Sequence, residues 1–159
     1  NLSLGGAGKT PCVEWVARQL AGRGRAVAVL SRGYGADAGR NDEALVLEEN
    51  LPDVPHLQGA DRVALARAAV EELECDALVL DDGFQHRRLH RDFDVVLIDA
   101  TRPPARDRLF PRGSLREPAA GLKRAQAVVV TRADQGDAGP VAGWLRTRFP
   151  HLTVAQGVH

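Results

Sequence analysis

The residues with the clearest chemical potential stand at the start of the chain. Residues 3–10 read Ser-Leu-Gly-Gly-Ala-Gly-Lys-Thr, close to the pattern G-x-x-x-x-G-K-[ST], in which glycines let backbone N–H groups wrap a polyphosphate. Ser3 stands in place of the first glycine, and Pro11 suits the first turn of a following helix. The alternative is a glycine-rich turn ahead of an ordinary helix. We expect a phosphate-binding loop made of Ser3, Leu4, Gly5, Gly6, Ala7, Gly8, Lys9 and Thr10.

Two adjacent aspartates follow a short apolar run. Residues 77–80 read Ala-Leu-Val-Leu, and Asp81-Asp82-Gly83 comes next. In a chain with a phosphate-binding loop, an acidic residue at a strand end is the usual second partner of Mg²⁺. Asp-Gly is also a strong turn signal, so a simple turn is the alternative. We expect Asp81 and Asp82 to complete the metal environment of Thr10, and which of the two contacts the metal stays open.

A second acidic pair, Asp42-Glu43, opens a segment with apolar residues behind it. Acidic residues at the start of a helix are favourable through capping and the helix dipole, which is the alternative explanation. If Asp42 faces the site, it can accept a proton from an attacking hydroxyl, as the base of a phosphotransferase does.

Arginines cluster at residues 87–91 and 112–116. Such stretches are usually solvated surface, but near a phosphate site an arginine can bind phosphate bidentately, and Arg116 is the strongest candidate. His86 and His90 are spaced to share a helix face as metal ligands. No third ligand has a suitable spacing and arginines flank the pair, so a zinc site is disfavoured.

Apolar runs and helical periodicities alternate along the chain. We expect strands at residues 26–30, 54–57, 77–80, 93–98, 127–130 and 152–155, and helices at 13–20, 42–49, 115–124 and 141–149. Asp61 should cap a further helix, with one face formed by Val63, Ala66, Val70 and Leu73. Near-continuous apolar strands that alternate with helices predict an α/β fold with a mostly parallel sheet covered on both faces, a P-loop NTPase-like three-layer sandwich. Ligands bind at the carboxyl ends of such strands, where Ser31, Asp81, Asp82, Asp99 and Thr131 stand.

The composition limits the function classes. The chain has 159 residues, 44% of them apolar, with 21 basic and 21 acidic side chains. This balance fits one globular domain and gives no support to nucleic acid as a partner. Cys12 and Cys75 are too few for a disulfide framework or a metal centre. No apolar run approaches the roughly 18 residues of a membrane span.

The chain opens directly inside the loop, without the strand that precedes a phosphate-binding loop. We therefore expect residues 1–159 to be a fragment, the nucleotide-binding lobe of a longer protein, with the first strand of its sheet missing.

Taken together, the segments resemble the tetraacyldisaccharide 4′-kinase family, the lipid A pathway kinases of Gram-negative bacteria. The matching segments are NLSLGGAGKTP, SRGYG, NDEAL, the Asp61-Arg62 pair, LDDGFQH, RDFDVVLIDA, FPRGSLREP and VVVTRAD. They run in the family's order from residue 1 to about residue 134. Asn41 stands where the family typically has Gly before Asp-Glu.

The resemblance implies transfer of the γ-phosphoryl group of ATP to the 4′-hydroxyl of a lipid-linked glucosamine disaccharide 1-phosphate, with Mg²⁺. Lys9 would hold the phosphates and Thr10, Asp81 and Asp82 the metal. Asp42 matches the family's catalytic base, supported by Glu43. Residues with supporting or substrate-facing roles would be Gln85, His86, Arg62 and Arg116. The family also carries a membrane-associating N-terminal helix and a smaller C-terminal lobe outside this chain, which implies work at the cytoplasmic face of the inner membrane.

A hypothesis of another class is a P-loop nucleotide-dependent switch or assembly ATPase without a small-molecule acceptor. It shares the GKT segment and an aspartate at a strand end. It gives no reason for SRGYG, DDGFQH and SLREP to occur together, and the kinase is therefore the leading hypothesis.

Overall fold

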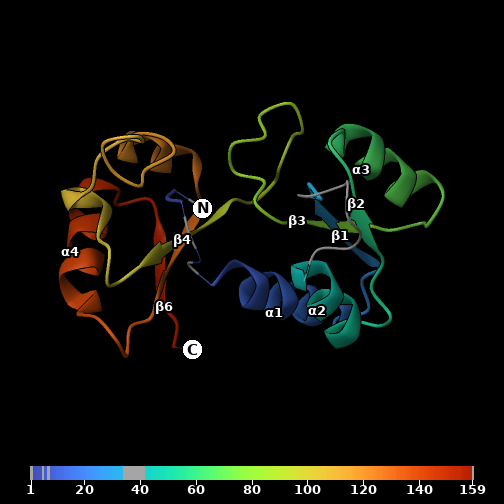
Figure 1. Cartoon of the computed structure of the whole chain (residues 1–159). Helices are drawn as coiled ribbons and strands as arrows, with labels where there is room; N and C mark the ends of the chain where they lie inside the picture. The colour runs from blue at the N-terminus through green and yellow to red at the C-terminus, as the bar shows by residue number, and fades with distance from the viewer. Residues whose placement is uncertain (1, 5, 7, 34–41, 159) are drawn as a thin grey trace. The chain divides into compact units, whose positions relative to one another are not determined.

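The computed structural model describes residues 2–4, 6, 8–33 and 42–158, and the chain divides into two compact units. Unit A comprises Asn1–Gly8 and His90–His159, and unit B comprises Lys9–Leu89. Each unit contains one three-stranded parallel sheet (Figure 1). The predicted α/β class with parallel strands is therefore confirmed.

The helices are α1 (Lys9–Ala21), α2 (Asp42–Asn50), α3 (Arg62–Glu71) and α4 (Ala138–Arg148), and two short 3₁₀ segments are η1 (Pro104–Arg106) and η2 (Ala119–Arg124). The strands are β1 (Val27–Ser31), β2 (His56–Gln58), β3 (Ala77–Leu80), β4 (Val95–Asp99), β5 (Ala127–Thr131) and β6 (Thr153–Gln156). Within the residues described, no helix combines the length and the apolar character that crossing a bilayer requires.

Unit B has three layers around its central strand. Its sheet has the order β2-β1-β3, and successive side chains of β1 point to opposite faces. Val27 and Val29 pack with buried residues of α1 and with Leu47 of α2, whereas Ala28 and Leu30 pack with buried alanines of α3. Because both faces are covered, β1 is apolar from Val27 to Leu30, as its sequence predicted.

Unit A has β5 at the centre of the order β4-β5-β6, and α4 packs against β5 and β6. Asp137 caps α4 by accepting a hydrogen bond from the Gly139 N–H at 3.0 Å. The buried residues of this helix follow the spacing of one helical face, i, i+3, i+4 and i+7. They are Ala138, Val141, Ala142 and Leu145.

Two local predictions were wrong. The helix expected at residues 115–124 is the 3₁₀ segment η2, which begins only after Pro118. Proline pushes the residue before it out of the helical region, so a regular helix through this position is unfavourable. The expected face of α3 is also incorrect, because its buried positions include Ala66 and Ala69 while Val70 and Leu73 are exposed.

We expect Leu30→Ala to lower the free energy of unfolding by about 3 kcal/mol, because the side chain is fully buried between β1 and α3 and its removal leaves a cavity. Leu73→Ala removes the same atoms from an exposed position and should change stability by no more than about 0.5 kcal/mol. Urea unfolding of both variants tests this difference. Equal losses in the two variants would contradict the assigned core.

Candidate functional site

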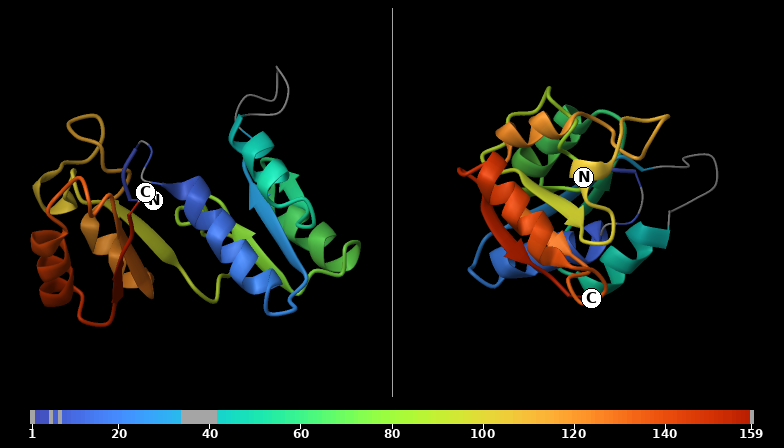
Figure 2. Two further views of the ribbon diagram at one scale, coloured as in Figure 1. Left: turned by 90° about the horizontal axis from the view of Figure 1, so that it is seen from below. Right: turned by 90° about the vertical axis from the view of Figure 1, so that its left-hand side faces the viewer.

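Short connections in unit B bring many predicted site residues to one edge of its sheet. Five residues separate α1 from β1, α2 from β2 and α3 from β3, namely 22–26, 51–55 and 72–76. Each helix therefore ends beside the amino end of a strand and begins at the carboxyl edge of the parallel sheet (Figure 2). Residues at the helix starts and strand ends thus share this edge. They are Lys9, Thr10, Ser31, Asp42, Glu43, Asp61, Arg62, Asp81 and Asp82.

Lys9 and Thr10 form the first residues of α1, and both are half-buried. Helix N-termini favour anions because their first N–H groups have no intrahelical partner. Gly8, the residue before the helix, has φ +76°, a conformation that glycine adopts readily and other residues rarely adopt. A helix start preceded by a glycine in this conformation is compatible with the predicted phosphate-binding loop, which stays a prediction. The predicted loop residues Gly5 and Ala7 lie outside the described residues.

Asp81 and Asp82 lie at the carboxyl end of β3. Asp81 is buried and its N–H donates to the Leu30 carbonyl at 2.8 Å, which continues the ladder between β1 and β3. Asp82 is half-buried with φ +52°. A Cβ on Gly83 would lie 2.7 Å from the Cβ of Leu80, so only glycine fits there. The turn that the Asp-Gly pair indicates is therefore present, with Asp81 buried and Asp82 half-buried, and the metal role of the two aspartates stays a prediction.

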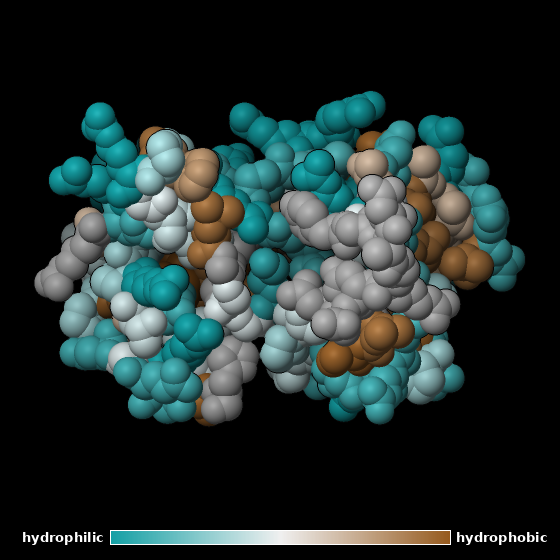
Figure 3. Space-filling model, in the orientation of Figure 1, coloured by the Kyte–Doolittle hydropathy of each residue, from teal (hydrophilic) through white to brown (hydrophobic). Residues whose placement is uncertain are grey.

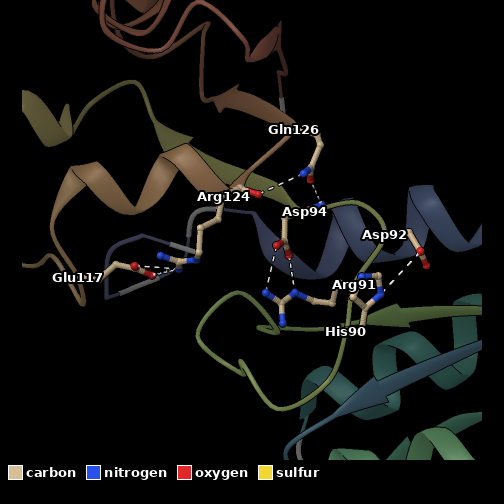
Figure 4. Close-up of polar contacts among 7 residues, drawn as sticks. All are labelled: His90, Arg91, Asp92, Asp94, Glu117, Arg124 and Gln126. Carbon is tan, nitrogen blue, oxygen red and sulfur yellow. Dashed lines mark hydrogen bonds and ion pairs between the residues drawn. The ribbon is translucent and has the colours of Figure 1, made fainter.

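The turn after β3 also contains Gln85 and His86. Both side chains are half-buried, and the His86 N–H donates to the Gly83 carbonyl at 2.9 Å. His90 belongs to unit A, is highly exposed and lies 3.9 Å from a carboxylate oxygen of Asp92 (Figure 4). Among the described residues, no three His, Cys, Asp or Glu side chains gather in a way that would hold a metal ion.

The start of α3 contains a capped aspartate and a buried arginine. Asp61 accepts hydrogen bonds from the N–H groups of Val63 at 3.0 Å and Ala64 at 3.2 Å. These two hydrogen bonds to the carboxylate lower the pKa of Asp61, and the one from Ala64 has the larger effect. Arg62 is only 7% exposed, and its buried Nε has no hydrogen-bond partner among the residues that the structure describes. A buried guanidinium atom without a partner favours an anionic ligand at this position.

Asp42 and Glu43 begin α2, as predicted, at the same edge. Their side chains lie outside what the structure describes, so their predicted roles as base and supporting acid stay predictions. The remainder of the predicted SRGYG segment after Gly33, and Asn41 before the acidic pair, also lie outside the described residues.

In unit A the first residues of the loop pair with the SLREP segment. Ser3 and Leu115 form an antiparallel bridge, the Leu4 N–H donates to the Ser114 carbonyl at 2.7 Å, and the Arg116 N–H donates to the Leu2 carbonyl at 2.9 Å. Arg116 is half-buried. The structure therefore brings Arg116 beside the amino end of the predicted phosphate-binding loop, although 111 residues lie between Leu4 and Arg116 in the sequence.

Two carboxylates hold the SLREP segment in place. Asp107 accepts hydrogen bonds from the hydroxyl and the N–H of Ser114 and from the N–H of Arg108. These hydrogen bonds, first of all the one from the Ser114 hydroxyl, lower the pKa of Asp107. Glu117, next to Arg116, receives a two-pronged hydrogen bond from Arg124 of η2 at 2.9 and 3.1 Å (Figure 4). The sequence did not reveal the role of Asp107, because nothing in its local pattern indicates a partner seven residues away.

Comparison with known proteins identifies the family. The family model described as tetraacyldisaccharide-1-P 4′-kinase (LpxK) matches residues 1–156. The chain belongs to this kinase family. A tetraacyldisaccharide 4′-kinase of Anaeromyxobacter dehalogenans is 51% identical in an alignment of length 152 that covers 85% of this chain and 40% of the relative. One of Geobacter sulfurreducens is 41% identical in an alignment of length 165 that covers 91% of this chain and 46% of the relative.

Solved structures agree with this membership. LpxK of Aquifex aeolicus, crystallised with ATP, has a TM-score of 0.74 and 36% identity, over 85% of this chain and 47% of that protein. The chain thus spans less than half the length of these kinases. HypB of Helicobacter pylori, crystallised with nickel, has a TM-score of 0.63 at 14% identity, over 99% of this chain and 76% of that protein, and this likeness shows the fold alone. Membership in the kinase family does not favour the alternative of a switch or assembly ATPase.

We expect Gly8→Ala to weaken nucleotide binding at least ten-fold, because a Cβ is strained at φ +76° and the loop would have to rearrange. Gly143→Ala is a matched control, since a Cβ added at that exposed position on α4 meets no atom within 4 Å. Titration calorimetry with Mg²⁺ and ATP measures both affinities. Affinity unchanged in Gly8→Ala would show that the conformation of this residue is irrelevant to binding.

We expect Asp107→Asn to flatten the pH dependence of stability on the acid side. The folded-state pKa of Asp107 is lowered, so its contribution is fully present above the unfolded-state pKa and is lost as the pH falls through the folded-state pKa. The wild type should therefore lose more stability than the variant between pH 5 and the acid range below the usual aspartate pKa of about 3.9. Thermal melts across that range measure the difference. Parallel curves for the two proteins would contradict the role of Asp107.

Proposed function

We propose that the chain is the nucleotide-binding portion of a longer kinase that phosphorylates the 4′-hydroxyl of a tetraacyl glucosamine disaccharide 1-phosphate in lipid A biosynthesis. The observation that carries this proposal is the edge of unit B, where the start of α1 and the buried Asp81 occur together in a member of this family. The chain covers only 40% and 46% of the length of the two relatives named above, which supports the proposal that it is part of a longer kinase.

The residues at this edge fit ATP and Mg²⁺. The amino end of α1 offers N–H groups that have no partner within the helix, together with the ammonium of Lys9, to phosphate oxygens. The Thr10 hydroxyl and the carboxylates of Asp81 and Asp82 are the hard oxygen donors that Mg²⁺ prefers. Bound there, Mg²⁺ would neutralise charge on the β- and γ-phosphates. Two carboxylates with one hydroxyl suit an ion that keeps several waters and takes further ligands from the nucleotide.

The reaction would proceed by in-line displacement. The oxygen of the 4′-hydroxyl forms a bond to the γ-phosphorus, the bond from that phosphorus to the β–γ bridging oxygen breaks, and ADP leaves. Asp42 takes the hydroxyl proton, and Glu43 supports the same site. Lys9 and the helix start stabilise the charge that moves to the leaving oxygen. Gln85, His86, Arg62 and Arg116 would orient the two substrates, and the buried Nε of Arg62 supports an anionic partner for that residue.

A lipid-linked acceptor agrees with the surface beside the proposed base. Leu45 and Val46 of α2 are exposed, and they follow Asp42 by about one turn. Figure 3 shows an apolar area over this helix. We infer that the acceptor remains anchored at the cytoplasmic face of the inner membrane, which segments outside this chain would contact. The zero formal net charge gives no support to nucleic acid as a partner.

In the full-length kinase that carries this sequence, Lys9→Ala and Asp42→Ala should each lower kcat by about a thousand-fold or more, because each removes a group that acts on the transferred phosphoryl or the attacking hydroxyl. The assay follows transfer of ³²P from ATP to the lipid disaccharide. Lys123→Ala removes the one other lysine of the chain, on the exposed side of η2, and Asp53→Asn removes an exposed carboxylate, so both should leave the rate unchanged.

Full activity of either Lys9→Ala or Asp42→Ala would refute the assigned roles. ATP hydrolysis that ignores the lipid disaccharide, with no phosphorylated lipid formed, would refute the acceptor and favour a nucleotide-dependent switch.

A further inference from the structure

Arg132 joins three segments of unit A that are distant in sequence. Its Nη1 donates to Oδ2 of Asp99, at the end of β4, at 2.6 Å. Its Nη2 donates to the carbonyl oxygen of Gly6, in the phosphate-binding loop, at 3.0 Å. Arg132 itself follows β5 directly. One guanidinium therefore connects two strand ends with the loop.

Asp99, the carboxylate that anchors Arg132, is itself held in place by hydrogen bonds. Asp99 is 6% exposed, and its Oδ1 accepts from the Thr101 N–H at 2.8 Å and from the Thr101 hydroxyl at 2.6 Å. Burial raises the pKa of Asp99, but the hydrogen bonds from Thr101 and the charge of Arg132 outweigh that effect, and the pKa lies below its usual value. The carboxylate is thus charged at neutral pH and holds the guanidinium in one place.

The backbone of Arg132 is also constrained. Its φ is +53°, which is uncommon for a long side chain. Its carbonyl accepts from the N–H groups of Gln135 and Gly136 at 3.0 and 3.1 Å, in the turn that follows β5. Strained backbone persists only where the surrounding contacts determine it, and such positions concentrate at functional sites.

The contact with Gly6 has a consequence for phosphate binding. In a planar trans peptide the carbonyl and the N–H point in opposite directions. Holding the Gly6 carbonyl therefore restricts the rotation of one peptide unit at this position of the loop. Glycine-rich segments have high conformational freedom, so a loop held in this way loses less entropy when it closes on a phosphate.

We propose that Arg132 is a positioning residue, which orders the phosphate-binding loop for ATP by holding the Gly6 carbonyl against the anchor Asp99. This rests on the proposed function in taking ATP as the ligand. Arg132 needs no contact with the nucleotide for this role. The guanidinium is required because its planar fork can donate to two acceptors at once, which the single ammonium of lysine does poorly.

Three variants of the full-length kinase separate loop ordering from simple stabilisation. Arg132→Gln removes the charge and both contacts. Arg132→Lys keeps the charge beside Asp99 but not the fork. Arg91→Gln is the matched control, because Arg91 makes a comparable bidentate contact with Asp94, at 2.7 and 3.1 Å and little exposed (Figure 4). For each variant, calorimetry without the disaccharide gives the dissociation constant for ATP. The melting temperature, the KM for ATP and kcat are measured separately.

We expect Arg132→Gln to raise the dissociation constant and KM for ATP at least five-fold, with kcat at saturating ATP changed less than three-fold. Arg132→Lys should recover the melting temperature but keep the raised dissociation constant. Arg91→Gln should bind ATP like the wild type. ATP binding within five-fold of the wild type in Arg132→Gln, or full recovery of binding in Arg132→Lys, would overturn the proposal. A wild type that binds ATP without phosphorylating the disaccharide would count against the proposed acceptor only.

Discussion

The short connections from helix to parallel strand are the constraint on which the candidate site depends. With five residues between each helix of unit B and the following strand, every helix must start at the edge where the strands end. The candidate site residues between Lys9 and Asp82 are spread over more than seventy residues of sequence. The chain topology alone places them at one edge of the sheet, because each stands at a helix start or a strand end. The continuous apolar run of β1, whose side chains need a covered face on each side of the sheet, keeps the helices in their layers.

Unit A depends on a different kind of connection. Leu4 of the loop and Leu2 just before it pair with the backbone of the SLREP segment, and Gly6 is joined to Arg132. The loop therefore has two supports, one through main-chain hydrogen bonds and one through a side chain with a buried anchor. Asp107 and Glu117 stabilise the first support, and Asp99 stabilises the second.

The class of fold and most of the edge residues could be predicted from sequence, because apolar strand runs and the GKT and DDG segments act locally. β3 was predicted at its observed bounds, and Asp61 caps α3 as expected. The contacts of Asp107 and Arg132 could not be predicted, since they depend on loops that fold back on each other. The buried face of α3 was predicted correctly at Ala66 but misjudged elsewhere, because the large residues Val70 and Leu73 were preferred over the small Ala69, which packs with Ala28 and Leu30 of β1.

Asp82 has a left-handed backbone conformation, and this determines which substitutions remove its charge without changing the shape of the turn. Asparagine tolerates φ near +52° at least as well as aspartate does, whereas alanine does not. An amide at position 82 therefore neutralises the charge and leaves the main chain as it is, but a methyl group changes electrostatics and conformation together. At Gly83 no side chain offers such a separation, because a Cβ there collides with Leu80. In the turn after β3, the charge at position 82 can thus be changed without changing the backbone, whereas position 83 accepts no residue other than glycine.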